Sequence, residues 1–162
     1  MNAIAAVDES WGIGRSGKLL ASLPGDLKYF KEKTLGKTIV IGRETFDSMS
    51  GKLLPERETV ILTRNADFKQ NCTVIHTLNE ALEYLKTKRS EDVYVAGGEN
   101  VYRQFIPYCD VFFITKLYGT FGADRFFTNL DAYPGEFAVK QASGVKEENG
   151  VKYRFFEYVR RK

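Results

Sequence analysis

The chain of 162 residues carries 24 Lys and Arg against 21 Asp and Glu, a net charge of +3 at pH 7. A chain of this length can bury a core without disulfides or metal ions, and we expect residues 1–162 to form a single domain. The weak positive charge forms no extended basic stripe, which argues against nucleic acid as a partner, and no apolar segment approaches the length of a membrane span. The isolated Cys72, Cys109 and His76 have the spacing of neither a zinc site nor a disulfide framework.

The N-terminal segment predicts a chain that begins inside its core. Ala3 to Val7 is a short continuous apolar run, typical of a strand buried on both faces of a parallel sheet. The run is too short for a signal peptide and lacks a basic flank, so we expect a cytoplasmic protein. We expect a monomer because no further apolar face is evident. The glycine-rich stretch from Asp8 to Ser22 predicts a long loop of the kind that often forms a lid.

A helix is expected to begin at Pro24, because proline suits the first helical position. Leu23, Leu27 and Phe30 then fall on one stripe, and Asp26 lies at its edge. If the stripe faces a cleft, burial raises the pKa of Asp26 while the helix N-terminus lowers it, which gives an acid able to hold a cationic ring or relay a proton. The alternative is an Asp favoured in the first helical turn by the helix dipole alone.

Two predicted strands run into helices at glycines. The strand from Thr38 to Ile41 ends at Gly42, and the strand from Asp92 to Ala96 ends at Gly97-Gly98 before a helix that extends to Phe105. Backbone N–H groups at such junctions meet the positive end of a helix dipole and form natural phosphate sites. Neither junction has the Gly-x-Gly-x-x-Gly spacing of a Rossmann unit, so a doubly wound dinucleotide domain is not supported.

Between these junctions, the strand from Thr59 to Leu62 ends at Thr63 and Arg64, where a guanidinium can take a phosphate. A short strand at Thr73 to Ile75 and a helix with apolar residues at helical spacing from Leu78 to Leu85 have the character of structural elements. The turn between them carries His76, which we expect to be a surface residue because no partner lies at ligand spacing.

The C-terminal part predicts three strands. Val111 to Leu117 is strongly apolar and carries one hydroxyl, that of Thr115. Phe137 to Ala142 and Val151 to Val159 form an antiparallel pair, with Lys146 to Gly150 between them as connection and Asn149-Gly150 as a hairpin turn.

Eight stretches, in order along essentially the whole chain, resemble dihydrofolate reductase. They are Gly12-Ile13-Gly14, Leu23 to Leu27 with Phe30, Gly42-Arg43-Glu44-Thr45, Leu54-Pro55-Glu56-Arg57, Leu62-Thr63-Arg64, Ala96-Gly97-Gly98, Ala123 to Phe127, and the short first strand. The resemblance implies an α/β fold with an eight-stranded, mostly parallel sheet, an antiparallel C-terminal strand and four flanking helices. It also implies hydride transfer from NADPH to C6 of the pterin ring of 7,8-dihydrofolate, with a proton arriving at N5.

On the substrate side, the resemblance implies that Asp26 grips the amino-pyrimidine edge of the pterin through two hydrogen bonds, supported by the Thr115 hydroxyl. Arg57 would clamp the α-carboxylate of the glutamate tail. The side chains that would line the pterin and aminobenzoyl sites are Ile4, Ala5, Leu27, Phe30, Met49 and Leu54.

On the cofactor side, the resemblance places Thr63 and Arg64 at the 2′-phosphate of NADPH, and Asp124 would hold the Gly12 to Leu19 lid closed. The nicotinamide pocket would be formed by Ala6, Ile13, Gly14 and Leu19. The pyrophosphate and its neighbours would contact Gly42, Arg43, Thr45, Gly97, Gly98, Val101 and Tyr102.

The chain departs from the family pattern at three places. Leu20-Ala21 replaces the common Pro-Trp, whose indole orders a water beside the pterin, and this affects how the proton is delivered. Glu44 and Asn100 stand where more basic residues often face the phosphates. We therefore expect the preference for NADPH to depend on Arg43 and Arg64.

Two other functions are weighed against this one. The pyrimidine reductase of riboflavin synthesis shares the fold and the cofactor turns, but it has no need of an acid at Asp26 together with Arg57. A non-catalytic nucleic-acid binder could use the 21 Tyr and Phe residues for stacking, yet most of them lie in apolar runs that predict core packing.

Overall fold

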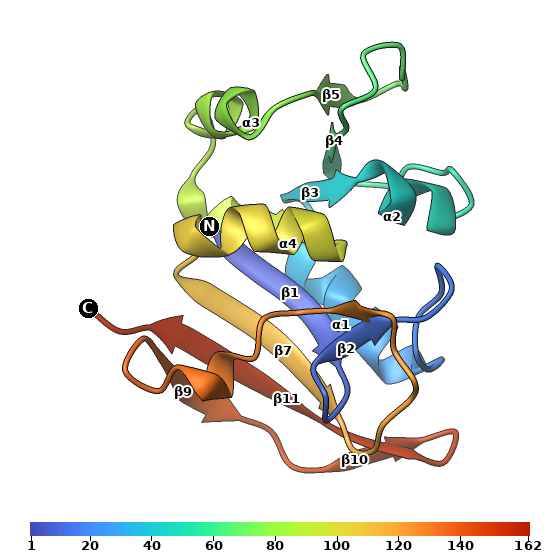
Figure 1. Cartoon of the computed structure of the whole chain (residues 1–162), viewed down its shortest axis with the longest axis vertical. Coiled ribbons are helices and arrows are strands. Elements are labelled where there is room, and N and C mark those ends of the chain that lie inside the picture. The colour runs from blue at the N-terminus through green and yellow to red at the C-terminus, as the bar shows by residue number, and fades with distance from the viewer.

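The computed structural model describes residues 1–162 and is built around one large sheet (Figure 1). The strand order across the sheet is β10-β11-β7-β1-β6-β3-β4-β5, with β9 also paired to β11. The strands of this sheet are β1 (Asn2–Val7), β3 (Thr38–Gly42), β4 (Glu58–Leu62), β5 (Thr73–Ile75), β6 (Val93–Val95), β7 (Val111–Leu117), β9 (Phe137–Ala142), β10 (Lys146–Glu148) and β11 (Val151–Arg160).

The middle of the sheet is parallel. β1 pairs with β6 and β7, β3 with β4 and β6, and β4 with β5, all in parallel. β11 runs antiparallel to β7, and its other edge is shared by β9 and β10. Because β9 and β10 lie along the same edge of β11, the sheet is eight strand positions wide. The predicted mostly parallel sheet with an antiparallel C-terminal strand is confirmed.

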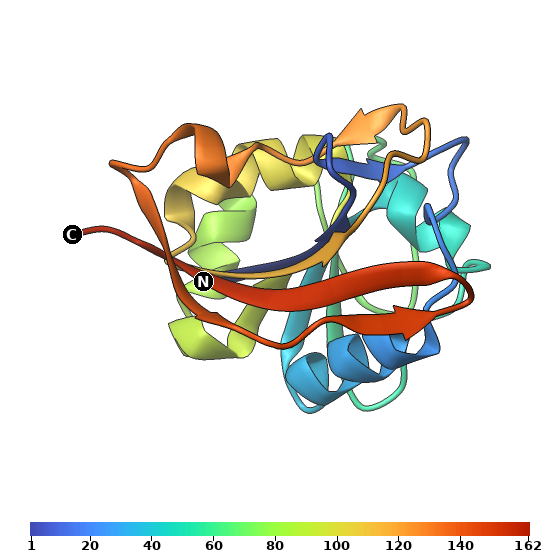
Figure 2. The same cartoon turned by 90° about the horizontal axis from the view of Figure 1, so that it is seen from below.

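Four α-helices cover the sheet on both faces. They are α1 (Pro24–Thr34), α2 (Arg43–Ser48), α3 (Leu78–Leu85) and α4 (Glu99–Phe105), and short 3₁₀ helices span Ser90–Asp92, Ile106–Tyr108 and Leu130–Ala132. α1 packs on Ile4 and Ile39, whereas Ala81 of α3 and Phe105 of α4 join Val40 in the core of the opposite face. Figure 2 shows α1 and α4 on opposite sides of the sheet. No helix is long and apolar enough to cross a bilayer.

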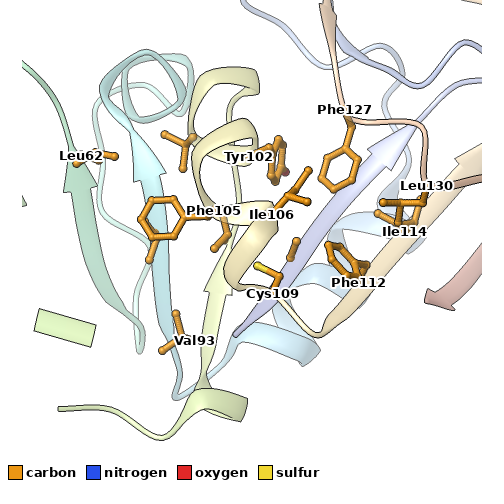
Figure 3. Close-up of a cluster of buried hydrophobic side chains, with 14 of the residues drawn as sticks. Leu62, Val93, Tyr102, Phe105, Ile106, Cys109, Phe112, Ile114, Phe127 and Leu130 are labelled. Carbon is orange, nitrogen blue, oxygen red and sulfur yellow. The ribbon is translucent and has the colours of Figure 1, made fainter. Parts of the chain in front are cut away.

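The largest apolar cluster covers one face of the sheet, from α3 and β4 across α4 to β7 and the segment that follows β8 (Arg125–Phe126). Figure 3 shows side chains of this cluster, among them Phe105, Phe112, Phe127 and Leu130. Their exposure is at most 3%. The central strands are buried on both faces, which explains why they are continuous apolar runs in the sequence.

Two connections contain strands that the sequence does not indicate. β2 (Gly12–Gly14) pairs with β8, so the expected lid loop and the loop after β7 form a small second sheet. Residues Lys146–Glu148, expected as part of a connection, form β10, and the positive φ angles of Asn149 and Gly150 build the predicted tight turn. These short strands are polar or glycine-rich, and tertiary pairing overrides their weak propensity.

Candidate active site

A carboxyl group and a buried hydroxyl meet where α1 crosses the sheet. The Thr115 hydroxyl, on β7, donates a 2.6 Å hydrogen bond to Oδ1 of Asp26 in the first turn of α1. Thr115 is 2% exposed and Asp26 is half-buried. Burial raises the pKa of Asp26, the Thr115 hydrogen bond lowers it, and the negative charge of Glu148 raises it further. The expected acid with a raised pKa is present.

The sequence places Asp26 there through Leu23 and Pro24, the residues at the start of α1. Pro24 opens α1, and the Asp26 N–H bonds to the Leu23 carbonyl at 3.0 Å. Leu23 is buried against Leu117 and Tyr153, so the first turn of α1 is fixed against β7 and β11. Asp26 therefore lies over β7, within hydrogen-bond distance of Thr115.

Five of the six predicted apolar lining residues lie on the same face of the sheet as Asp26, and Ala5 is the exception. Ile4, Phe30 and Leu54 belong to one cluster, and Met49 belongs to the next, with Ala96 packing against both. Leu27 joins no cluster and is 53% exposed. On β1, Ala6 pairs with Thr115 and packs against the cluster of Leu23 and Leu117 on the Asp26 side. Ala5 pairs with Ile114 and packs into the main core of the opposite face, because successive side chains of a strand point to opposite faces, so its side chain does not line the predicted pterin site.

Arg57 has no acidic partner in the chain. Its Nε donates to the Pro55 carbonyl at 3.0 Å and its Nη1 to the Thr34 hydroxyl at 3.4 Å, but it forms no salt bridge. Burial lowers the pKa of Arg57, and the only nearby charge that opposes this is Glu56. A half-buried guanidinium with free N–H groups can bind a carboxylate through two hydrogen bonds.

The two predicted glycine junctions are brought together at the carboxyl ends of the strands. The Gly42 N–H bonds to the Gly97 carbonyl at 2.8 Å. A Cβ added to Gly42 would lie 3.1 Å from the Val101 side chain, and a Cβ added to Gly98 would lie 3.2 Å from the Thr45 hydroxyl oxygen. These glycines let two backbone turns approach each other closely, and a cis peptide bond joins Gly97 to Gly98.

Three predicted phosphate contacts follow neighbouring strands at this edge. Gly42 pairs with Leu62, so Arg43 and Thr63 come next on adjacent strands. The Arg43 guanidinium lies 4.7 Å from the Phe68 ring centroid and 3.6 Å from the Asp47 carboxylate, and Arg64 is exposed. The edge thus combines cationic side chains with closely packed backbone, which fits a phosphorylated cofactor.

His76, expected to be a surface residue, is only partly exposed. Its Nδ1 lies 2.8 Å from the Thr63 carbonyl oxygen. The register of β4 and β5, in which Leu62 pairs with Ile75, brings these two residues together. Sequence spacing alone could not reveal this, because the strands are joined by a long connection.

The lid segment is tied to the loop after β7. The Ser16 N–H donates to the Asp124 carboxylate at 3.0 Å, and the Asp124 N–H donates to the Gly14 carbonyl at 2.9 Å. Trp11 is buried, and Ile13 packs against the main core, whereas Leu19 is 67% exposed. The predicted tie between Asp124 and the lid is present.

Sequence reasoning missed two groups that shape the site. Asp8 is buried and accepts hydrogen bonds from the N–H groups of Ser10, Gly12 and Phe121. Tyr102, predicted only as a cofactor neighbour, donates its hydroxyl to the Ile4 carbonyl at 2.6 Å. Neither contact has a sequence signal. The Tyr102 contact joins segments distant in the chain, and the Asp8 contacts depend on the shape of two loops.

Comparisons with known proteins agree with this arrangement. A family model described as Dihydrofolate reductase matches residues 1–160. The dihydrofolate reductase of Enterococcus faecium is 34% identical over 152 residues, which are 93% of this chain and 90% of that protein. The dihydrofolate reductase of Bacillus subtilis (strain 168) is 34% identical over 156 residues, 96% of this chain and 91% of that protein.

A solved structure agrees with the fold. The dihydrofolate reductase from Enterococcus faecalis, complexed with NADP(H) and RAB-propyl, has a TM-score of 0.85 and 37% sequence identity to this chain. The match covers 99% of this chain and 96% of that one. Sequence and fold thus agree over nearly the whole length, and the chain belongs to the dihydrofolate reductase family.

Proposed function

We propose that the protein reduces 7,8-dihydrofolate to 5,6,7,8-tetrahydrofolate with NADPH. The single observation that carries this function is the half-buried Asp26 carboxyl group, hydrogen-bonded to Thr115 on an otherwise apolar face, in a chain of this family. The solved relative from Enterococcus faecalis was complexed with NADP(H), which supports the choice of cofactor. The protein is accordingly an NADPH-dependent oxidoreductase.

Asp26 would hold the amino-pyrimidine edge of the pterin through two hydrogen bonds. A paired contact of this kind is strong where water is excluded, and Thr115 fixes the carboxyl group from the sheet side. The side chains that would contact the pterin and aminobenzoyl groups are Ile4, Leu27, Phe30, Met49 and Leu54, whereas Ala5 could take part only through its backbone. Arg57, which lacks an acidic partner, would bind the α-carboxylate of the glutamate tail.

NADPH supplies the hydride when bound. Ala6, Ile13, Gly14 and Leu19 would hold its nicotinamide end, and Gly42, Arg43, Thr45, Gly97, Gly98, Val101 and Tyr102 would surround its pyrophosphate. Thr63 and Arg64 would bind the 2′-phosphate. The chain's contribution is positioning, because a reaction between two aligned carbon atoms depends on how closely they are held.

Proton supply to N5 would depend on Asp26 and on solvent. The raised pKa of Asp26 keeps part of the population protonated at higher pH than for an ordinary Asp. Ala21, which stands where family members often have tryptophan, packs against the cluster of Leu23, Leu117 and Tyr153 and has no side-chain donor. Any water beside the pterin must therefore be held by other groups.

The competing functions are less well supported. A riboflavin-pathway pyrimidine reductase would not require Asp26 together with Arg57, and the curated relatives are dihydrofolate reductases. The aromatic side chains that a nucleic-acid binder would use are largely packed together, as in the pairs of Trp11 with Phe127 and Phe112 with Phe137.

We further propose that residues 1–162 act as a single-domain, cytoplasmic monomer.

The loss of NADPH absorbance on addition of dihydrofolate tests the function. The wild type should oxidise NADPH only when dihydrofolate is present. Asp26→Asn should lose most of this activity at neutral pH and regain part of it in acid, where the substrate arrives already protonated. Glu32→Gln, which neutralises an exposed carboxylate on the same helix, should behave as wild type. A folded wild type that binds NADPH without oxidising it would exclude dihydrofolate as the substrate.

A further inference from the structure

The hairpin between β10 and β11 reaches the first turn of α1. Oε1 of Glu148, the last residue of β10, accepts a 2.7 Å hydrogen bond from the Gly25 N–H and a 2.5 Å hydrogen bond from the Tyr153 hydroxyl. Next to it, the Asn149 side chain donates to the Ser22 carbonyl at 2.8 Å. Two successive residues of the hairpin thus bind both sides of the turn that carries Asp26.

The contact between the hairpin and α1 leaves no spare room. A Cβ on Gly25 would lie 2.5 Å from the Tyr153 hydroxyl oxygen and 2.6 Å from the Glu148 carboxylate. Tyr153 is 2% exposed, and its strand pairs with β7 at Leu117. The Glu148 carboxylate is therefore held in one place by a buried side chain.

The Glu148 carboxylate lies at the N-terminus of α1, where the helix dipole favours a negative charge. It takes the Gly25 N–H, one of the free donors at the N-terminus of α1, and adds a negative charge one residue before Asp26. The pKa of Asp26 is raised by burial and by the charge of Glu148, and it is lowered by the Thr115 hydrogen bond.

The other groups near Asp26 carry no compensating positive charge. Thr115 binds Asp26 from β7. The charge of Asp26 raises the pKa of three tyrosines, Tyr153 on β11, Tyr29 on α1 and Tyr102 on α4. Glu148 is thus the one charged side chain that acts on Asp26 from a neighbouring element.

We propose that Glu148 is a positioning residue for the reaction: held by the Tyr153 hydroxyl, its carboxylate fixes the first turn of α1 and places a negative charge beside the turn that carries Asp26. The inference rests on the proposed role of Asp26. An uncharged acceptor could also bind the Gly25 N–H, so the hydrogen bond alone does not require a carboxylate at this position. The proposal explains why a charged residue stands there.

Glu148→Gln separates charge from geometry, because glutamine keeps an oxygen acceptor for Gly25 and Tyr153. The loss of a neighbouring negative charge eases ionisation of Asp26, so its titration midpoint should fall by about half to one pH unit. The ¹³C signal of the Asp26 carboxyl carbon, followed against pH in the ligand-free protein, measures this shift without turnover. Glu147→Gln, at the adjacent exposed carboxylate, is the matched control and should leave the midpoint unchanged.

The kinetic consequence has a defined sign. Activity that requires protonated Asp26 falls as pH rises past its titration, so the falling limb of the kcat profile should move to lower pH in Glu148→Gln. A midpoint that stays at the wild-type value in folded Glu148→Gln would overturn the proposal and leave Glu148 as a purely structural contact.

The two proposals fail separately. An inactive wild type would refute the proposed function, because the titration of Asp26 is measured without substrate.

Discussion

Asp26 is balanced between neighbours that act on its proton in opposite directions. The Thr115 hydroxyl stabilises the ionised carboxylate, whereas burial and the Glu148 charge favour the protonated acid. In the proposed function this balance would serve two needs of the reaction, since an ionised Asp26 would hold the amino-pyrimidine edge most strongly and a protonated Asp26 could share its proton. Changing either neighbour should therefore move the pH profile in a direction that identifies it.

Thr115→Val should move the profile of activity upward in pH. Loss of the 2.6 Å hydrogen bond removes the influence that lowers the pKa of Asp26, so the falling limb shifts to higher pH, opposite to Glu148→Gln. The KM for dihydrofolate should rise about tenfold at neutral pH, because a hydrogen bond to a charged group contributes ~1.5–3 kcal/mol. Steady-state kinetics across pH measure both effects, with Thr120→Val on the exposed loop as control. An unchanged profile would show that the hydroxyl does not act on Asp26.

Arg64→Ala should weaken NADPH far more than NADH. Arg64 is exposed at the end of β4 beside Thr63 and has no salt-bridge partner, so its charge is free for a 2′-phosphate. The KM for NADPH should rise about tenfold and that for NADH should hardly change, with the difference shrinking at high salt. Lys69→Ala, which removes another exposed cation from the same connection, serves as control. Equal effects on both cofactors would exclude Arg64 from phosphate recognition.

At the level of elements, the start of α1 depends on a glycine that the sequence does not mark as special. Gly25→Ala should destabilise the protein by about 1–3 kcal/mol, because the new Cβ meets Tyr153 and Glu148 at 2.5 and 2.6 Å. Urea unfolding measures the loss, and activity should fall with it as Asp26 is displaced. Gly135→Ala, where an added Cβ meets nothing within 4 Å, should be nearly neutral. A Gly25→Ala variant as stable as the wild type would contradict the prediction, because it would show that the β10–β11 hairpin can shift away from α1 at no cost.

The elements with strong apolar patterns could be predicted from the sequence. Val111–Leu117, Phe137–Ala142 and Thr73–Ile75 have the expected bounds, and α1 begins at Pro24. β2 and β10 could not be predicted, because their polar or glycine-rich residues become strands only through pairing with β8 and β11. For the same reason the contact of Glu148 with Gly25, between residues 123 positions apart, has no sequence signal.

Across the whole molecule, the lid is firm at its base and held at its tip by few contacts. At the base, Trp11 is buried against Phe127, and the Phe127 N–H bonds to the Trp11 carbonyl at 2.8 Å. Lys116, which pairs with Asp131, lies 5.0 Å from the Trp11 ring centroid. At the tip, residues Arg15 to Leu19 are exposed, and Asp124 supplies the side-chain hydrogen bond to Ser16. Local opening should therefore begin at the tip.

Asp124→Ala tests whether that single carboxylate controls closure. The Ser16 N–H loses its acceptor, so its amide hydrogen should exchange faster, whereas the buried Trp11 segment should stay protected. Because an exposed hydrogen bond to a charged group contributes about 1 kcal/mol, NADPH should dissociate about fivefold faster. Hydrogen exchange and stopped-flow release measure the two effects, with Asp67→Ala as an exposed control. If the Ser16 amide exchanged faster but NADPH dissociated at the wild-type rate, opening of the tip would not control cofactor release. The nicotinamide end would then be held by the base of the lid, around Trp11.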